Sequence, residues 1–466
     1  MLKNKDQKYT LKLTKYLYSL KYNSIPKSTI IKAKDLIVDF VGYSSRSVDE
    51  KSAKILQNLT SKFGGAGNSV IIGTKQKTSP VWAALVNSAM GHMTEIDDTH
   101  HGSQSHMGEA VIAAALATAE DCNADGKTVL KAIICGYECG IRAGLTVMPS
   151  HYTLGWHPSG TMTTFGAAMS AGITLGLSLD QLLHSLGIAG TQAAGNFIHL
   201  GSRGMTKDLN PGKAAANGVL AAYLAKDGFT SCKDVFENSR GWTKLYTKKS
   251  NLNKLLNNLG KSFFIEEVVH KLYPGCYHLH TAREAARRLV DQKNINYTDI
   301  KKVIANIYQI GALYTDDPKP WAKGKGLHGP RFSAQFQIAL VLCEGIKGLW
   351  KSYDDKYVYK KLNDKKIRKL MKKIVIIHDD TMQMSWPNEL VSSVEIKLKS
   401  NEKFKKSLTL PRDEKDPEID DSIEKKFKIV GKLIFSDNQI NKIMKDISLL
   451  DRKKNIKSIS KKLQSI

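Results

Sequence analysis

Apolar positions recur at helical spacing along residues 1–60, with lysines between them, as in TLKLTKYLYSL and IIKAKDLIVDFVGY. This pattern predicts amphipathic helices with one apolar and one basic face. From residue 79 to residue 126 the chain has no Lys or Arg, and SPVWAALVNSAMGHM and GEAVIAAALATAE are apolar on nearly every side. These two segments predict buried helices. They flank a polar stretch, EIDDTHHGSQSH (95–106).

Helical spacing continues toward residue 228 in segments rich in Gly and Ala. GKTVLKAIICGYECGIRAGLTVM and GWHPSGTMTTFGAAMSAGITLGL predict two further helices. Ser178 and Gln181 have the spacing of a capping box at the start of the next helix. PGKAAANGVLAAYLAKDGF predicts one more helix, ended by Gly228.

The pattern changes again near residue 270. KKVIANIYQI, KIVIIHDD and SSVEIKLKS are short and β-branched, which predicts strands, while AREAARRLVD and FSAQFQIALVLCEG predict helices between them. After LPRDEKDPEIDD, helical spacing returns. We therefore predict a mostly α protein with an inserted α+β domain. The large all-helical domain takes residues 1–267 and 403–466, and the smaller α+β lid takes residues 268–402.

The formal net charge is +26, which raises the question of a nucleic-acid or membrane partner. The lysines are spread among Asp and Glu, without an aromatic-interleaved basic motif, so we expect a solvated surface and neither partner. The six cysteines include no CxxC pair, which favours a reducing compartment. The N-terminus lacks the apolar core of a signal peptide, and no run of 18 apolar residues is present. We expect a soluble cytoplasmic protein.

The polar stretch 95–106 admits three interpretations. Its carboxylates and histidines could bind a metal, but their spacing matches no standard zinc pattern. Asp97, Asp98 and Thr99 could instead cap or fix the ends of the loop. A polar loop between dry helices could also shift the pKa of a His or Asp toward values that suit acid–base catalysis.

Three other segments carry candidate chemistry, each weak alone. His157 lies between an aromatic residue and a proline in GWHPSG, where a structural role is common. Lys207 and Lys213 flank a turn that opens a helix, where backbone N–H groups and a lysine can hold a carboxylate. KLYPGCYHLH (271–280) lies at the predicted domain junction, a common place for a binding cleft.

Taken together, these segments resemble the MmgE/PrpD family. The resemblance rests on HMTEIDDTH, GWHPSGTMTTFGAAMSAG, MTKDLNPGKAAANG and KLYPGCYHLH, and on RFSAQFQIALVL, VEIKLKS and LPRDEKDPEIDDSIEKKF. The segments run in order from about residue 30 to about residue 440. The family includes 2-methylcitrate dehydratase, cis-aconitate decarboxylase and iminodisuccinate epimerase. The resemblance implies a helical domain with an inserted α+β lid, a homodimer, and a cleft that uses no cofactor and no metal.

The resemblance also implies which residues form the site. The family's catalytic positions fall on Glu95, Thr99, His106, His157, Lys207 and Lys271. Its histidine after the KxYP motif falls on His280 or, in the decarboxylase branch, on Cys276. We assign Cys276, His280 and Arg142 to substrate binding. Histidines 106 and 157 are the expected proton carriers, and the lysines with Arg142 are the expected partners of the substrate carboxylates.

Two departures from the family pattern bear on the activity. Glu95 replaces the usual Asp, and Cys276 replaces the histidine of the decarboxylase branch. We therefore predict a metal-independent lyase acting on a small di- or tricarboxylate, with hydro-lyase (dehydratase) chemistry on a 2-methylcitrate-like substrate first. Epimerisation of an iminodisuccinate-type dicarboxylate is second, and cis-aconitate-type decarboxylation is third. The alternative from another class is a non-catalytic basic binding protein that retains the fold.

Overall fold

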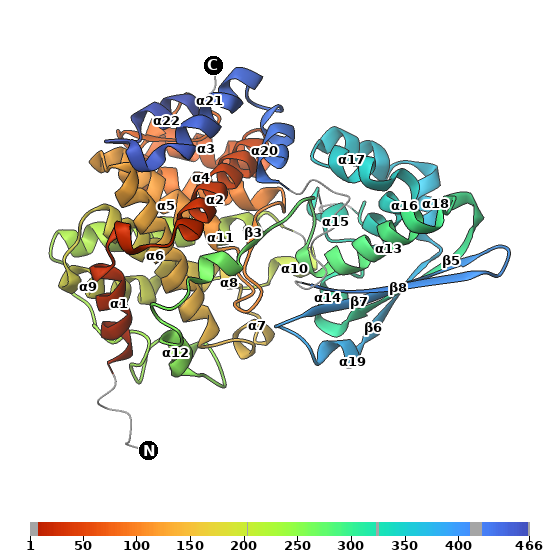
Figure 1. The fold of residues 1–466 in the computed structure, drawn as a ribbon, viewed down its shortest axis with the longest axis horizontal. Helices are drawn as coiled ribbons and strands as arrows, with labels where there is room; N and C mark the ends of the chain where they lie inside the picture. The colour runs from red at the N-terminus through yellow and green to blue at the C-terminus, as the bar shows by residue number, and fades with distance from the viewer. Residues whose placement is uncertain (1–7, 203, 323–325, 411–421, 465–466) are drawn as a thin grey trace.

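The computed structural model describes residues 8–202, 204–322, 326–410 and 422–464. It is mostly helical, with one small mixed sheet in the C-terminal part, as predicted (Figure 1). The linker expected at LPRDEKDPEIDD lies almost wholly outside the described residues. None of the described helices is long and apolar enough to cross a membrane.

The N-terminal helices form a layered bundle whose centre is α8. Its helices are α1 (Tyr9–Ser19), α2 (Lys27–Arg46), α3 (Lys51–Phe63), α4 (Pro80–Met93), α5 (Met107–Cys122), α6 (Gly126–Leu145), α7 (Ser150–Thr153), α8 (Pro158–Thr174), α9 (Leu179–Gln192), α10 (His199–Ser202), α11 (Thr206–Lys226) and α12 (Trp242–Leu245). Helix α8 packs on α5, α6, α9 and α11, and α11 also packs on α4. The all-round apolar segments predicted to be buried helices are α4 and α5, and the capping box of Ser178 and Gln181 is confirmed at the start of α9.

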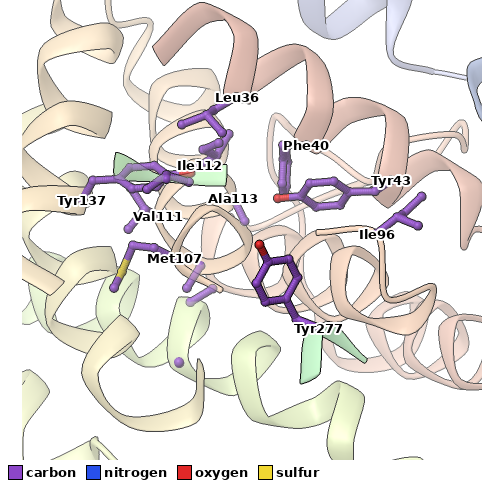
Figure 2. Packing of buried hydrophobic residues seen from close by; sticks show 14 of the residues in the cluster. Leu36, Phe40, Tyr43, Ile96, Met107, Val111, Ile112, Ala113, Tyr137 and Tyr277 are labelled. Carbon is purple, nitrogen blue, oxygen red and sulfur yellow. The ribbon is translucent and has the colours of Figure 1, made fainter. Parts of the chain in front are cut away.

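The buried side chains beneath the polar loop come from several of these helices. Leu36, Phe40 and Tyr43 of α2 face Met107, Val111 and Ile112 of α5, and Tyr137 of α6 packs in the same region (Figure 2). Ile96 enters this core from the polar stretch itself and is fully buried. The loop is therefore fixed from below by an apolar anchor.

The sheet has the strand order β6-β5-β7-β8. Strands β5 (Ile300–Tyr308) and β6 (Ile374–Asp379) are parallel, and β7 (Leu390–Leu398) is antiparallel to both β5 and β8 (Lys403–Leu410). Helices α13 (His280–Lys293) and α16 (Ala334–Lys351) pack with the sheet at one end of the molecule (Figure 1). The smaller helices of this part are α14 (Gln309–Thr315), α15 (His328–Arg331), α17 (Asp355–Leu362), α18 (Lys365–Met371) and α19 (Asp380–Gln383).

Strand β8 lies beyond the expected end of the α+β segment. We assigned residues from 403 onward to the helical domain, but 403–410 pairs with β7 along its whole length. Lys403 and Lys405 fall on the exposed face, but Lys406 takes a position on the face of Phe404, Leu408 and Leu410 and breaks the apolar alternation. Lysines are common on edge strands because they discourage pairing with another chain. The sheet therefore continues to residue 410, beyond the predicted end of the lid at residue 402.

The chain then returns to the N-terminal helices. Helices α20 (Ile423–Gly431), α21 (Asp437–Ser448) and α22 (Lys457–Lys462) follow the sheet, and both α20 and α21 pack on α2 (Figure 1). Segments from both ends of the chain therefore share one helical layer.

Close packing of α11 on α8 yields a stability prediction. A Cβ on Gly218 would lie 2.5 Å from the Ala167 side chain and 2.6 Å from the Ala168 backbone nitrogen. We expect Gly218→Ala to lower the free energy of unfolding by about 1–3 kcal/mol, because the helices must separate to admit the methyl group. Urea denaturation measures the change. Gly201→Ala is the control, since nothing lies within 4 Å of that position; equal effects of the two substitutions would contradict the packing argument.

Candidate active site

The polar loop joins α4 to α5 and is held in an unusual backbone conformation. Glu95 has φ of 58°, in the left-handed region that side-chain-bearing residues rarely adopt. Its carbonyl accepts a hydrogen bond from the Gly275 N–H at 3.2 Å. Because Ile96 points into the core, its neighbours Glu95 and Asp97 are directed elsewhere, toward two buried lysines.

A short strand pair brings the first lysine to the loop. Strand β3 (Asp98–Thr99) pairs antiparallel with β4 (Val269–His270). Lys271 follows β4 directly, and its Nζ lies 2.9 Å from Asp97 Oδ1 and 3.5 Å from Glu95 Oε2. Lys271 is 1% exposed. Burial opposes its charge, but the carboxylates of Asp97 and Glu95 outweigh burial and raise the pKa of Lys271.

The second lysine comes from the first turn of α11. We expected Lys207 to precede a helix that starts near Pro211, but the helix begins at Thr206 and contains Pro211. Lys207 forms an ion pair with Glu95, and its Nζ lies 2.5 Å from His92 Nε2. Burial opposes ionisation of Glu95, but Lys207 and Lys271 hold the pKa of that carboxyl well below its usual range.

His92 connects Lys207 to a third carboxyl group. An ammonium group only donates hydrogen bonds, so His92 Nε2 accepts, and the ring proton resides on Nδ1. Nδ1 lies 2.5 Å from Glu109 Oε1 in the first turn of α5. Burial, aided by the charge of Lys207, lowers the pKa of His92 to about 4. His92 is therefore neutral at physiological pH.

His106 is oriented by acceptors on one side of its ring. Its Nδ1 lies 2.6 Å from Asp97 Oδ2, 2.8 Å from the Asp98 carbonyl and 3.0 Å from Thr99 Oγ1. Since neither the carbonyl nor an ionised carboxylate can donate, Nδ1 carries a proton. Burial opposes ionisation of Asp97, but His106 and Lys271 hold the pKa of that carboxyl well below its usual range. In this arrangement Nε2 is the nitrogen available to exchange a proton with a bound molecule.

His157 has the opposite tautomer. It is the N-terminal cap residue of α8, and its Nδ1 lies 2.9 Å from the side-chain nitrogen of Asn210. The same amide nitrogen lies 3.3 Å from the Asn196 carbonyl, which fixes the orientation of the amide. The amide donates, so His157 Nδ1 accepts and its proton is on Nε2. Burial, together with the charge of neighbouring histidines and Lys207, holds the pKa of His157 well below its usual range.

These groups surround one cavity with about 560 Å³ of empty space, its mouth included. Of the residues predicted for the site, five are brought together in its wall with Cys276: Glu95, Thr99, His106, His157 and Lys207. Lys271 lies behind Glu95 rather than in the wall. The remaining lining residues are Gln104, Tyr152, Phe197, His199, Leu200, Tyr277, His278, Tyr314 and Phe332.

Two predicted substrate-binding residues lie elsewhere. Arg142 is fully buried on α6, where its Nε donates to Glu138 at 2.8 Å and its NH1 donates to the Asn257 carbonyl at 2.8 Å. It fixes the segment after α12 and does not line the cavity. His280 starts α13 and has its Nε2 3.3 Å from the Gly275 carbonyl. It supports the turn of the KLYPGC segment instead of lining the cavity.

Several residues of the site gave no sequence signal of their function. His92 and Glu109 stand in segments that predict buried apolar helices, and Asn210 lies within a Gly- and Ala-rich helix. Asp97, expected to shape the loop, belongs to the charged cluster, whereas Asp98 accepts from the Gly108 N–H at 3.1 Å and from Tyr137 at 2.8 Å. Only the packing of α4, α5 and α11 brings these polar groups together.

His92, Asp97 and Glu109 also have the donor set of a metal site, with one ligand atom of each within 4.8 Å of the others. However, the His92 nitrogen that faces the two carboxyl groups is Nδ1, which donates its proton to Glu109, and Lys207 and Lys271 lie beside His92 and Asp97. Two ammonium groups beside the donor atoms disfavour a cation there. We therefore treat this group as a charge network and not as metal ligands.

Comparison with known proteins fits this arrangement. The MmgE/PrpD N-terminal domain matches residues 11–255, and the MmgE/PrpD C-terminal domain matches residues 273–449. The chain belongs to the MmgE/PrpD family. In this member of the family, the polar loop, helix α11 and the 271–276 segment meet at one cavity.

Three relatives illustrate the similarity. A cis-aconitate decarboxylase of Aspergillus terreus (strain NIH 2624 / FGSC A1156) is 25% identical, over 95% of this chain and 93% of the relative. Another cis-aconitate decarboxylase of Aspergillus terreus is 31% identical, over 60% of each chain. The cis-aconitate decarboxylase of Homo sapiens is 23% identical, over 93% of this chain and 90% of the relative.

The buried neutral histidines predict acid sensitivity. Burial lowers the pKa of His92 and of His151 to about 4, compared with about 6.5 in the unfolded chain. Between these values the unfolded chain binds more protons, so stability falls as the pH falls from about 6.5 to about 4. Each histidine contributes about 1.4 kcal/mol per pH unit. Urea denaturation at several pH values measures this slope. His151→Gln, outside the cavity wall, should make it shallower; an unchanged slope would refute the assignment.

The tautomer of His157 predicts a specific effect at Asn210. In Asn210→Asp, a carboxylate faces His157 Nδ1 and draws the ring proton to that nitrogen. We expect kcat/KM to fall about tenfold or more, because a wrong tautomer disables a catalytic histidine. The matched control is Asn217→Asp on the same helix, whose amide donates to the Gln192 carbonyl away from the cavity. If both variants keep the wild-type kcat/KM, Asn210 does not set the tautomer.

Proposed function

We propose that this enzyme is a carboxy-lyase that decarboxylates a small tricarboxylate of the cis-aconitate class. The observation that carries the proposal is the cavity in which Lys207, His106 and His157 meet. The near full-length similarity to relatives named cis-aconitate decarboxylase supports the reaction and the substrate class. Because of this similarity, we rank decarboxylation above the dehydration of a 2-methylcitrate-like substrate that the sequence motifs favour.

The cavity has separate groups for binding the carboxylates and for moving a proton. Lys207 supplies positive charge at the wall, and His157 offers its Nε2–H as a neutral hydrogen-bond donor. A neutral imidazole can donate a hydrogen bond to a substrate oxygen and stabilise negative charge there. Thr99 Oγ1 lies beside His106 and fixes its ring. Substrate carboxylates would therefore lie between Lys207 and His157, with the carbon skeleton toward His106.

The chemical step needs one bond cleavage and one protonation. The bond between a carboxylate carbon and its neighbour breaks, CO₂ leaves, and the electron pair shifts through the adjacent double bond toward another carboxylate. His106 in its protonated form then delivers the Nε2 proton to the carbon that carries the developing charge, and takes a proton from solvent afterwards. Asp97 stabilises the protonated ring before transfer, and Lys207 stabilises the negative charge on the carboxylate.

A second candidate, dehydration of a 2-methylcitrate-like substrate, is favoured by Cys276. Cys276 lines the cavity. By the family resemblance, the decarboxylase branch has a histidine at this position. Burial and the charge of Glu95 raise the pKa of the Cys276 thiol to about 11, so it is a neutral thiol and not a proton carrier at neutral pH. A reaction that depends on a histidine at this position would fail here, whereas dehydration by His106 and His157 would not.

Parallel assays with cis-aconitate, 2-methylcitrate, citrate and iminodisuccinate test the proposal. We expect CO₂ release from cis-aconitate, and Lys207→Met should lower kcat/KM about 100-fold or more by removing charge stabilisation. Lys213→Met is the control, because Lys213 on the same helix donates to the Ala194 carbonyl outside the cavity wall. Turnover of 2-methylcitrate without cis-aconitate would select the second candidate. Turnover of none of the four would leave the non-catalytic binding protein as the better hypothesis.

A further inference from the structure

Glu109 is a buried carboxyl group that the proposed reaction does not use. It lies in the first turn of α5, is 0% exposed and is absent from the cavity wall. Its Oε1 accepts the Nδ1 proton of His92 at 2.5 Å. Through His92 it is connected to Lys207, and its other neighbour is Asp97.

A charge count shows why the state of Glu109 matters. The cluster beneath the cavity contains the carboxyl groups of Glu95, Asp97 and Glu109 and the ammonium groups of Lys207 and Lys271. With all five ionised, the cluster would carry one excess negative charge in a buried region. Such a charge would oppose binding of an anionic carboxylate and would itself be costly to bury.

The hydrogen bonds offer a way to remove that charge. Glu109 Oε2 is buried and has no hydrogen-bond partner among the described residues, and Asp97 Oδ2 has an ion-pair contact with His106 Nδ1 at 2.6 Å, without hydrogen-bond geometry. One oxygen of each of these two carboxyl groups lies within 4.8 Å of an oxygen of the other. A single proton between them satisfies both oxygens, and Asp97 is the better place for the negative charge because it faces Lys271 and His106.

We propose that Glu109 is held as a neutral carboxylic acid that donates its proton to Asp97 and accepts from His92. As a positioning residue, Glu109 keeps His92 aligned on Lys207. Because it is neutral, the charges of the two lysines are balanced by the carboxylates of Glu95 and Asp97 alone. The cluster of five groups is then neutral, with no excess negative charge to oppose an entering anion. The effect on substrate binding rests on the proposed function, whereas the proton on Glu109 does not.

The surroundings of Glu109 favour the neutral form. The titratable groups that face it are Asp97, Asp98, His92, Lys207, Tyr43 and Tyr137. Burial, followed by the charge of Asp97, raises the pKa of Glu109 well above its usual range, and Lys207 is the cation that opposes this rise. His92 is neutral and the two tyrosines stay protonated, since burial raises the pKa of each.

Infrared difference spectroscopy tests the proton directly and needs no substrate. The spectrum of the wild-type protein minus that of Glu109→Gln should contain the carbonyl stretch of a protonated carboxyl group. Glu138→Gln is the matched control, because Glu138 is equally buried but forms an ion pair with Arg142. A wild-type spectrum that loses only carboxylate bands in Glu109→Gln would overturn the proposal, whatever the enzyme turns over.

Kinetics test the positioning role. A glutamine can accept from His92 and donate to Asp97 as a protonated glutamate does, so Glu109→Gln should keep kcat/KM within about threefold of the wild type and preserve its pH profile. Glu109→Leu removes both hydrogen bonds and should lower kcat/KM about tenfold or more. Asp97→Asn removes a required charge and should lower it further. A large loss in Glu109→Gln together with a small loss in Asp97→Asn would assign the charge to Glu109 and overturn the proposal.

Discussion

The structure of the cavity depends on the pairing of two buried lysines with the carboxylates of one loop. Lys207 pairs with Glu95, and Lys271 pairs with Asp97. Each of these ions would be strongly destabilising alone, because removing one member of a buried pair leaves an uncompensated charge. The helix, the loop and the segment after β4 are therefore fixed relative to one another by charge as well as by apolar packing. The left-handed backbone of Glu95 is a strained conformation that persists within this surrounding structure.

The same constraint assigns different states to three histidines in one small volume. Burial, aided by Lys207, keeps His92 neutral, and burial keeps His157 neutral with its proton on Nε2. His106 has its Nδ1 against the carboxylate of Asp97. Their ring centroids lie 5.3 Å apart for His92 and His106, and 5.5 Å apart for His92 and His157. Three histidines thus have three different roles: His106 is positioned to carry a proton, His157 to donate a hydrogen bond, and His92 to connect Lys207 with Glu109. The hydrogen-bond partner of each ring determines its role.

The sequence predicted the fold well because its patterns are local. Segments that are apolar on every side predicted α4 and α5, and β-branched segments predicted β5, β6 and β7, whereas Lys406 on the apolar face of the strand hid β8. Family resemblance predicted the wall residues Glu95, Thr99, His106, His157 and Lys207. Arg142 was assigned to substrate binding only because it is a cation, and it pairs with Glu138 one turn away. His92, Glu109 and Asn210 could not be predicted, since their function arises only from contacts between helices distant in sequence.

The two-residue pairing of β3 with β4 has a mechanical consequence. Strand β4 immediately precedes Lys271, and the α/β part of the chain follows it. A rigid swing of that part about this segment would draw the Lys271 ammonium away from Asp97 and expose an unbalanced carboxylate to a dry core. Separation of the two parts of the chain at this segment is therefore opposed by the cost of leaving a buried charge without its partner. The segment formed by β4 and Lys271 therefore both connects the two parts of the chain and neutralises the carboxylate of Asp97.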